Sequence, residues 1–278
     1  MQIEVGARSD VGRLRSNNED SYRLEPALQL FVLSDGMGGE AHGEVASQMA
    51  AEVVATHCLE AANNRAAPFF GEPRLDLSEK TNRLASAAQL ANRKIHELAQ
   101  SSPEYRGMGA TILAVWLEDP QMSLVHVGDS RAYLLRAGSL EQLTADHSLV
   151  AEQVRRGLIT PQQADTSTMQ SVLIRALGTR EEVEVDADEQ VLLEGDTLLL
   201  CSDGLNRMVT DPEIASTLLT SLNAQAGADR LVELANDYGG EDNITVIVLR
   251  VLPEADGVFA RLRRWAGGSS DAPSPGGH

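Results

Sequence analysis

The chain has 278 residues, of which 42% are hydrophobic, which is enough for one large domain or two small ones. Its formal charge of -18 at pH 7 and its pI near 4.7 argue against nucleic acid as a partner, because the phosphate backbone binds basic surfaces. No segment reaches the roughly 20 apolar residues of a membrane-spanning helix, and the N-terminus lacks a secretory signal pattern. We therefore expect a cytoplasmic protein without an integral membrane span.

The first part of the chain predicts two strands followed by a pair of helices. Alternating apolar residues over 3–8 and the apolar run 28–33 are typical of strands. Helical spacing of apolar residues predicts a helix over about 43–62 and a second one over about 77–100. The residues between these helices include Asn, Gly and Pro and indicate a loop.

From Thr111 onward the apolar pattern changes to a period of two, which is typical of an antiparallel meander. The strands are expected at 111–116, 122–127, 132–136 and 141–143. The segment from about 146 to 178 departs from this pattern, because a helix near 149–156 is followed by a polar stretch. We interpret this segment as a flap inserted into the domain.

The next part predicts short strands and a second pair of helices. The strands are expected at 183–185, 191–193, 197–201 and 244–252, and the helices at about 211–221 and 226–238. Strands, a helix pair, strands and a second helix pair in this order suggest two layers of sheet covered by helices.

After residue 252 the sequence loses this character. Residues 269–278 are rich in Gly, Ser and Pro, so we expect the C-terminal tail 253–278 to be partly disordered. Before them, Phe259 and Trp265 accompany three arginines. This segment either docks on an anionic partner or membrane surface, or packs its aromatic side chains on the domain as a terminal helix.

Acidic residues lie at the ends of predicted elements in five places, namely at Glu19 and Asp20, Asp35, Asp129, Asp203 and Asp242. Three of them, Asp35, Asp129 and Asp203, come directly after apolar runs, so the strands would deliver them to one edge of a sheet. Gathered carboxylates repel one another unless something neutralises them, and divalent cations with oxygen ligands are the ordinary solution. The pattern therefore predicts a metal enzyme.

The glycines after Asp35 admit a second interpretation. Gly36, Gly38 and Ala41 match a dinucleotide-binding fingerprint, in which backbone N–H groups hold a pyrophosphate. However, Asp35 would point a negative charge at that anion, and the second parallel strand of such a fold is not predicted. A tight turn in which Asp35 and the Gly36 carbonyl face a cation explains the glycines better.

Seven motifs occur in order: Arg15-Ser-Asn-Asn-Glu-Asp20, Asp35-Gly-Met-Gly-Gly39, Gly107-Met-Gly-Ala-Thr111, Gly128-Asp-Ser-Arg131, Asp146-His-Ser148, Ser202-Asp-Gly204 and Asp242-Asn243. Over about residues 2 to 252 this set resembles the bacterial branch of the PPM or PP2C family of metal-dependent protein serine/threonine phosphatases. The resemblance implies an α+β fold, a four-layer α-β-β-α sandwich of two mainly antiparallel sheets flanked by helix pairs, with residues 1–252 as the phosphatase domain.

The resemblance also implies a core site for two Mn²⁺ or Mg²⁺ ions. Asp35 would bridge the two ions, and Asp203 and Asp242 would complete one of the two positions. The other position would use the Gly36 carbonyl and the pair Glu19 and Asp20. Which member of that pair touches the metal directly is left open.

Three further positions carry expected roles. Asp129, together with Asp203, matches the third metal position found in many relatives. Arg15 would hold the substrate phosphate, because a guanidinium fork donates two parallel hydrogen bonds to a tetrahedral oxyanion. Protonation of the leaving alkoxide would fall to His42 or to a metal-bound water, since this chain has Met37 where eukaryotic relatives often carry a histidine.

Two such cations lower the pKa of a bridging water and stabilise both oxygens of an in-line displacement. We therefore expect direct hydrolysis of phosphoserine and phosphothreonine in proteins, without a phosphoenzyme. By resemblance, the partners would be phosphorylated proteins, either a bacterial Ser/Thr kinase or its targets, and the enzyme a monomer. The alternative is a catalytically silent domain that binds phosphoproteins; loss of metal ligands would indicate it, and none of the matching positions is lost.

Overall fold

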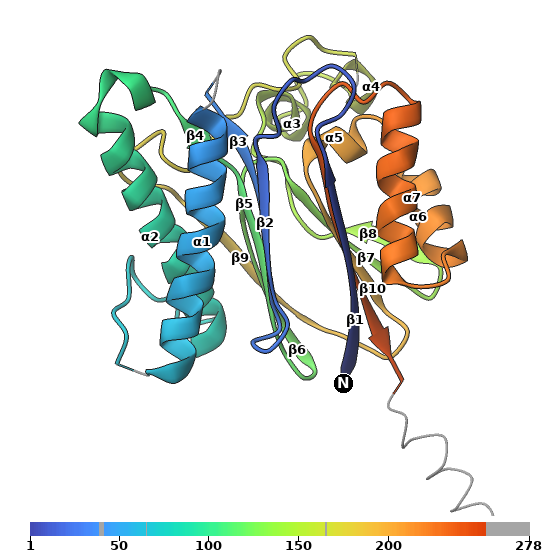
Figure 1. Ribbon diagram of the computed structural model, residues 1–278, viewed down its shortest axis with the longest axis horizontal. Coiled ribbons are helices and arrows are strands. Elements are labelled where there is room, and N and C mark those ends of the chain that lie inside the picture. The colour runs from blue at the N-terminus through green and yellow to red at the C-terminus, as the bar shows by residue number, and fades with distance from the viewer. Residues whose placement is uncertain (39–41, 65, 165, 254–278) are drawn as a thin grey trace, which may run out of the picture.

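The computed structural model describes residues 1–38, 42–64, 66–164 and 166–253. Its strands form two antiparallel sheets packed face to face (Figure 1). One sheet contains β1 (Gln2–Asp10), β11 (Ile244–Leu252), β10 (Thr197–Cys201), β7 (Arg131–Arg136) and β8 (Ser139–Gln142), in this spatial order. The other contains β2 (Asp20–Glu25), β3 (Leu30–Met37), β5 (Ile112–Glu118), β6 (Gln121–Val127) and β9 (Asp186–Val191), with β4 (Gly109–Ala110) paired to β3.

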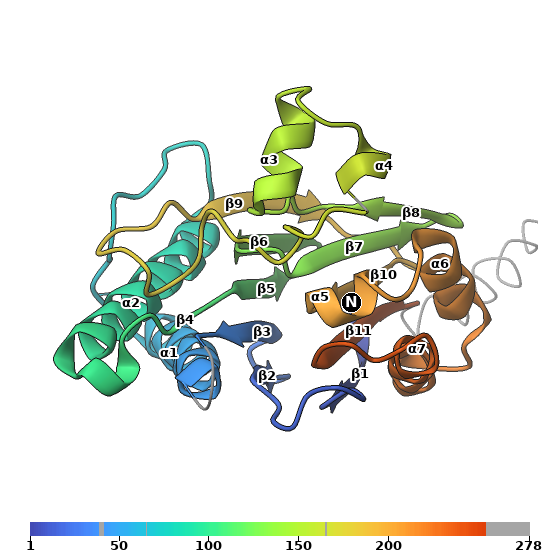
Figure 2. The same ribbon diagram turned by 90° about the horizontal axis from the view of Figure 1, so that it is seen from above.

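A pair of helices covers the outer face of each sheet (Figure 2). The β2–β9 sheet is covered by α1 (His42–Asn63) and α2 (Glu79–Ser101), and the β1–β8 sheet by α6 (Asp211–Thr220) and α7 (Ala224–Asp237). The short helices are η1 (Pro103–Tyr105), α3 (Leu149–Arg155), α4 (Pro161–Ala164) and α5 (Asp203–Asn206). In Figure 2, α3 and α4 project from the sandwich within the predicted flap.

Three hydrophobic clusters fill the three spaces between these layers. Leu33, Leu113 and Leu200 belong to the cluster between the two sheets, where strands from both sheets bury their inner faces. The second cluster lies between one sheet and α1 and α2, and the third lies between the other sheet and α6 and α7. The four-layer α-β-β-α sandwich expected from the sequence is therefore confirmed.

Two edge strands differ from the sequence prediction. Strand β2 was not predicted, and the strands expected at 183–185 and 191–193 are replaced by β9, which lies between them. Strands β2 and β9 lie at the two edges of the same sheet. An edge strand pairs with only one neighbour, and polar side chains are tolerated there. Their polar sequences therefore lack the apolar pattern from which the other strands were predicted.

Isolated backbone bridges hold the flap together and connect it to the sandwich. Ser148 and Leu173 form an isolated bridge within it, and Leu177 bridges to Ala110 of β4. Within the described ranges, no helix is both long and apolar enough to cross a membrane. The basic, aromatic segment with Phe259 and Trp265 and the predicted tail beyond residue 253 lie outside the described residues.

Candidate active site

Strand ends from both sheets bring acidic side chains to one end of the sandwich. Asp35 in β3 lies opposite Asp20 in β2 of the same antiparallel pair. Asp129 follows β6 closely, Asp203 begins α5 just after β10, and Asp242 precedes β11. Carboxylates from two different sheets therefore face the same region, as the spacing of the motifs predicts.

A cleft of about 360 Å³ lies at this end of the sandwich. The predicted site residues in its wall are Arg15, Glu19, Asp35, Gly36, Asp129, Asp203 and Asp242. The flap adds Ser171 and Leu173. Asp20 lies behind this wall with 8% of its surface exposed, and its Oδ2 accepts a hydrogen bond from Oγ of Ser202 at 2.7 Å.

Two glycines allow the first turn of α1 to approach the metal-ligand motifs closely. A Cβ atom on Gly36 would lie 2.0 Å from the carbonyl oxygen of Gly43, and a Cβ on Gly43 would lie 2.5 Å from Oε2 of Glu19. The Gly36 N–H also donates to the Glu19 carbonyl oxygen at 3.1 Å. Larger residues at either position would push Glu19 and α1 apart, which explains the glycines without a nucleotide-binding role.

Hydroxyl groups hold the backbone of Asp35 in place. Oγ1 of Thr111 accepts a hydrogen bond from the Asp35 N–H at 2.9 Å, and the Thr111 N–H donates to the Asp35 carbonyl at 2.8 Å. Oγ of Ser130 lies 2.8 Å from Oγ1 of Thr111, which links this contact to the residue after Asp129. Both hydroxyl residues belong to motifs of the sequence, but the motifs alone do not indicate these hydrogen bonds.

Asn243 fixes the loop that carries Glu19. Its Oδ1 accepts a hydrogen bond from the Glu19 N–H at 2.8 Å, and its Nδ2 donates to the carbonyl oxygens of Val11 and Asn17 at 3.0 and 2.9 Å. This positioning role of Asn243 was not predicted from the sequence. An amide next to the predicted ligand Asp242 was the available signal, because Asn offers both donors and an acceptor to nearby backbone.

Burial raises the pKa of the acidic groups in the absence of metal. It raises the pKa of Asp20 to about 7 and that of Asp129 to about 8, and neighbouring carboxylates add to both shifts. The pKa of Asp35 is raised well above its usual value by burial and then by Asp20 and Asp203. A cluster of this kind ionises readily only when cations offset its charge.

The donor set fits divalent cations. Oδ1 of Asp20 and Oδ1 of Asp203 are buried without a hydrogen-bond partner among the described residues, and Asp203 lies in the cleft wall, where its oxygen is available to a cation. When ionised, six carboxylates and two guanidinium groups in and behind the cleft carry a formal charge of -4, which two divalent cations cancel. These groups are Glu19, Asp20, Asp35, Asp129, Asp203 and Asp242, with Arg15 and Arg207. Oxygen ligands of this type suit Mg²⁺ and Mn²⁺.

Arg15 lies at the mouth of the cleft. Its Nη2 donates to Oδ2 of Asp242 at 2.8 Å, and about half of the Arg15 side chain is exposed. The guanidinium therefore remains accessible from solvent while Asp242 holds it beside the acidic cluster. This arrangement can bind an incoming phosphate next to the metal ligands.

His42 does not line this cleft among the described residues. It starts α1, and its ring packs edge-on against Tyr105 with the ring centroids 5.6 Å apart. It is still close enough to Glu19 to lower the pKa of that carboxyl, although burial dominates and raises it. His42 thus lies outside the cleft wall, in which most of the acidic residues are found.

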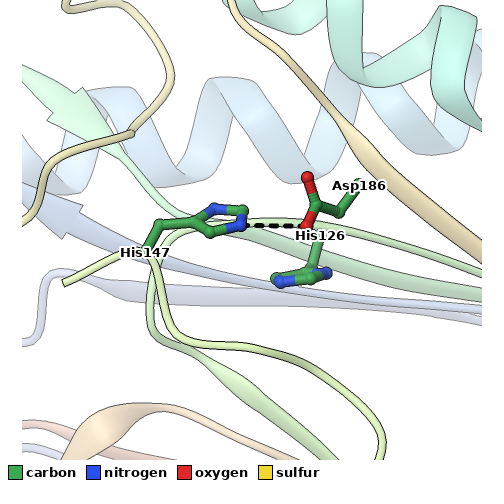
Figure 3. A group of neighbouring side chains, drawn as sticks. All are labelled: His126, His147 and Asp186. Atoms are coloured by element: carbon green, nitrogen blue, oxygen red, sulfur yellow. Dashed lines mark hydrogen bonds and ion pairs between the residues drawn. The ribbon is translucent and has the colours of Figure 1, made fainter. Parts of the chain in front are cut away.

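A second group of potential metal ligands lies at the base of the flap (Figure 3). Ligand atoms of His126, His147 and Asp186 all lie within 4.8 Å of one another. However, Nη1 of Arg175 lies 3.1 Å from Nε2 of His147 and pairs with Asp186. Because this cation already neutralises Asp186, we assign the group a structural role. Nδ1 of His147 accepts from the Gly128 N–H at 3.0 Å, which holds the turn before Asp129.

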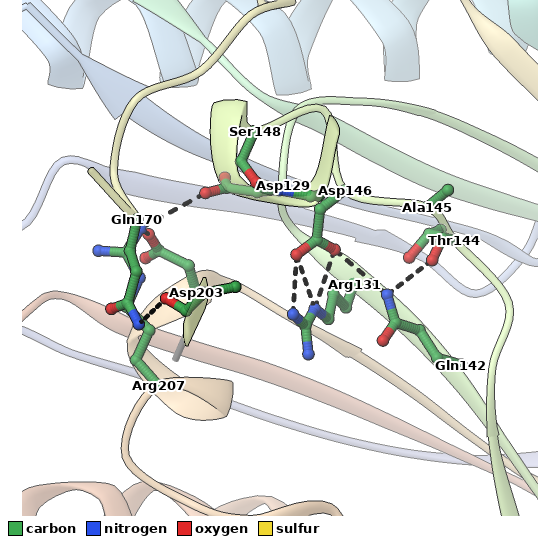
Figure 4. A network of polar contacts seen from close by, with 12 residues as sticks. Asp129, Arg131, Gln142, Thr144, Ala145, Asp146, Ser148, Gln170, Asp203 and Arg207 are labelled. Atoms are coloured by element: carbon green, nitrogen blue, oxygen red, sulfur yellow. Dashed lines mark hydrogen bonds and ion pairs between the residues drawn. The ribbon is translucent and has the colours of Figure 1, made fainter. Parts of the chain in front are cut away.

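A larger cavity of about 950 Å³ lies between the flap and α5 and α6. Asp129, Asp203 and Arg207 line both this cavity and the cleft, so the two spaces share a wall. On its floor, Arg131 holds Asp146 with paired hydrogen bonds, from Nε at 2.9 Å and from Nη2 at 2.7 Å (Figure 4). The cavity gives the cleft an extension beneath the flap.

A family model described as Protein phosphatase 2C matches residues 13–236 of the chain. The chain belongs to the protein phosphatase 2C family. A serine/threonine phosphatase stp of Listeria welshimeri is 38% identical over 245 residues, which are 87% of this chain and 93% of that protein.

Solved structures of protein phosphatase 2C relatives agree with the fold. The Mycobacterium tuberculosis serine/threonine phosphatase PstP/Ppp has a TM-score of 0.78 and 38% identity, over 90% of this chain and 99% of that one. The catalytic domain of PstP, solved in complex with two manganese ions, has a TM-score of 0.76 with the same identity and coverage. The manganese ions of the second structure agree with the oxygen-rich donor set of the cleft.

Proposed function

We propose that this chain hydrolyses phosphoserine and phosphothreonine in proteins. One observation carries the proposal: carboxylates from both sheets converge in one cleft, and Arg15 lies at its mouth beside Asp242. Relatives named serine/threonine phosphatases at 38% and 40% identity support the same substrate class. The catalytically silent alternative lacks support, because every acidic position of the motif set is retained.

The acidic residues divide into two groups for holding Mn²⁺ or Mg²⁺. Asp35 would contact both cations, with Asp203 and Asp242 on one side and the Gly36 carbonyl on the other. Glu19 lines the cleft whereas Asp20 lies behind it, so we assign the direct contact to Glu19 and a supporting charge to Asp20. When bound, two such cations make water a nucleophile at neutral pH and stabilise the oxygens of an in-line displacement.

The remaining residues bind and orient the substrate. Arg15 would hold the phosphate with its guanidinium fork, which Asp242 keeps directed along the cleft. His42 is proposed as the proton donor for the leaving alkoxide, which requires its ring to turn away from Tyr105. The cavity beneath the flap would receive residues that neighbour the phosphorylated one, because it shares a wall with the cleft.

The wider setting is also part of the proposal. Bacterial relatives named serine/threonine phosphatases support a role opposite a Ser/Thr kinase, with the kinase or its targets as substrates. We propose that residues 1–252 form the phosphatase domain, that it acts as a monomer, and that it works in the cytoplasm. A chain ending at Pro253 should retain full activity on a phosphopeptide.

Phosphate release from phosphothreonine and phosphotyrosine peptides tests the function. The assay compares Mn²⁺, Mg²⁺ and EDTA for the native chain, for Asp203→Ala and for the control Glu241→Gln, which changes an exposed carboxylate next to Asp242. We expect release from phosphothreonine with metal, none with EDTA or with Asp203→Ala, and native rates for the control. Activity that persists in EDTA would contradict the metal mechanism.

A further inference from the structure

Arg207 occupies the position between the two carboxylates that would hold a third metal ion. Its Nη2 lies 2.5 Å from Oδ2 of Asp203 and 3.5 Å from Oδ2 of Asp129 (Figure 4). We propose that the guanidinium of Arg207 takes the place of a third divalent cation in this chain. The inference deepens the proposed function, on which it rests for the identity of the site.

The local backbone brings Arg207 to this position. Helix α5 begins at Asp203, and Arg207 is its C-cap, so the two side chains are separated by one helical turn and share a face. The Arg207 N–H donates to the Asp203 carbonyl oxygen at 3.0 Å. The Arg207 side chain is 23% exposed, so most of it is packed inside the protein.

The two oxygens of Asp203 have separate surroundings. Oδ2 is paired with Arg207, whereas Oδ1 is buried without a hydrogen-bond partner among the described residues. Asp203 can therefore offer Oδ1 to a cation in the core site, beside Asp35, while Oδ2 remains with the guanidinium. Asp129 faces the same guanidinium, and Arg207 counteracts the effect of burial on its pKa.

The charge of the site also favours this arrangement. Two divalent cations already cancel the charge of the six carboxylates and two guanidinium groups. A third would leave an excess of +2 and would lie beside a guanidinium, where like charges repel strongly in a partly buried site. The nearby Arg131 does not change this balance, because it is paired with Asp146.

A rival arrangement is open to the same residues. Arg207 also lines the cavity beneath the flap, so its side chain has room to turn away from Asp129 and Asp203. The two carboxylates would then be free for a third cation, as the resemblance to the family implies. The rival predicts a third metal site in the native chain, and our proposal predicts that this site appears only when Arg207 is replaced.

Metal stoichiometry distinguishes the two arrangements. The metal-free full-length chain is equilibrated by dialysis against millimolar Mn²⁺, and bound manganese per chain is measured by mass spectrometry. We expect two ions in the native protein and three in Arg207→Ala, with the third lost again when Asp129→Ala is added. Three ions in the native protein, or an unchanged two in a folded Arg207→Ala, would overturn the proposal.

Further variants guard against misfolding and nonspecific effects. Arg207→Lys keeps the positive charge and should keep two ions, whereas Arg207→Gln removes it with little change in length and should bind three. Arg155→Ala removes another guanidinium from the same flap cavity, one that pairs with Glu152, and should stay at two. Gain of a third ion in Arg155→Ala would count against the proposal, because metal binding would then depend on net charge and not on the position of Arg207.

The stoichiometry is independent of the proposed activity. A chain that binds two manganese ions but releases no phosphate from any phosphopeptide would contradict the proposed function and leave the role of Arg207 supported. A chain that is active and binds three ions would support the function and contradict the role of Arg207.

Discussion

Asp20 and Asp35 lie directly opposite each other in the antiparallel pair of β2 and β3. Like charges at such positions destabilise a sheet, and here Asp20 is buried while Asp35 is partly buried in the wall of the cleft. The two carboxylates therefore repel each other when ionised, and the cations proposed to bind at this site would relieve that repulsion. Our first two predictions follow from this relationship.

Asp35→Asn should lower activity and raise stability at the same time. The amide removes a partly buried charge that faces other carboxylates, without changing the size of the side chain, so the metal-free protein should gain about 1 kcal/mol of unfolding free energy. Phosphopeptide hydrolysis should fall at least about 100-fold, because the residue proposed to contact both cations is lost. Thermal unfolding in EDTA and in Mn²⁺ checks both effects. The control Glu241→Gln should change neither, and a destabilised metal-free Asp35→Asn would contradict the account.

The metal-free protein should become less stable as pH rises from about 5 to 8. The pKa of Asp20 is raised to about 7 and that of Asp129 to about 8, so the folded state binds more protons than the unfolded state in this window. This contribution is fully present below about pH 4 and is lost as pH passes through the folded-state values, with a total on the order of a few kcal/mol.

Saturating Mn²⁺ should reverse this trend, because metal ligands must be deprotonated to bind. Melting temperatures measured across this range in EDTA and in Mn²⁺ provide the comparison. A metal-free melting temperature that rises steadily from pH 5 to 8 would show that these carboxylates are not buried together.

Arg15→Lys should impair substrate binding more than an ordinary surface substitution. Lysine keeps the charge but not the paired donors that hold Asp242 and a phosphate, so kcat/KM should fall by about 10-fold or more, mostly through KM. Arg13→Lys is the matched control, because Arg13 does not line the cleft among the described residues. Steady-state kinetics on one phosphothreonine peptide compare the variants, and equal effects of the two substitutions would remove Arg15 from substrate binding.

His42→Ala tests the proposed proton donor through the choice of leaving group. An alkoxide leaving group needs a proton, so kcat on a phosphothreonine peptide should fall by about 10²-fold or more. p-Nitrophenyl phosphate releases a stable phenolate, so its kcat should change little. His96→Ala, which alters a histidine of α2 bonded to the Gly178 carbonyl oxygen, should affect both substrates alike. An unchanged kcat on the peptide in His42→Ala would exclude this role.

The central strands and the acidic residues were predictable from sequence because both follow from burial. Strands such as β10 are buried along their whole length, so they appear in the sequence as apolar runs. The end of each run then indicates where the aspartate that follows it will lie. Strands β2 and β9 were missed or displaced because their edge positions accept polar residues. Their pairing depends on partners far away in the chain, which no local pattern reveals.

Roles that depend on contacts between distant segments were also beyond sequence reasoning. Asn243 holds a loop more than 200 positions away, and nothing in its neighbourhood indicates which backbone groups it bonds. Arg207 was detectable in principle, because a basic residue four positions after Asp203 lies on the same face of a helix. Helix α5 is only four residues long and was not predicted, so the sequence did not reveal that relation.

The ligands reside in opposite halves of the sandwich, with Asp35 in one sheet and Asp242 at the start of a strand in the other. Under the proposed assignment, cations bound between them would cross-link the two sheets. Under the same assignment, a cell short of manganese would lose stability as well as turnover, because this end of the fold would open and become accessible to proteases. Metal supply would then govern how much of the enzyme survives as well as how fast it works.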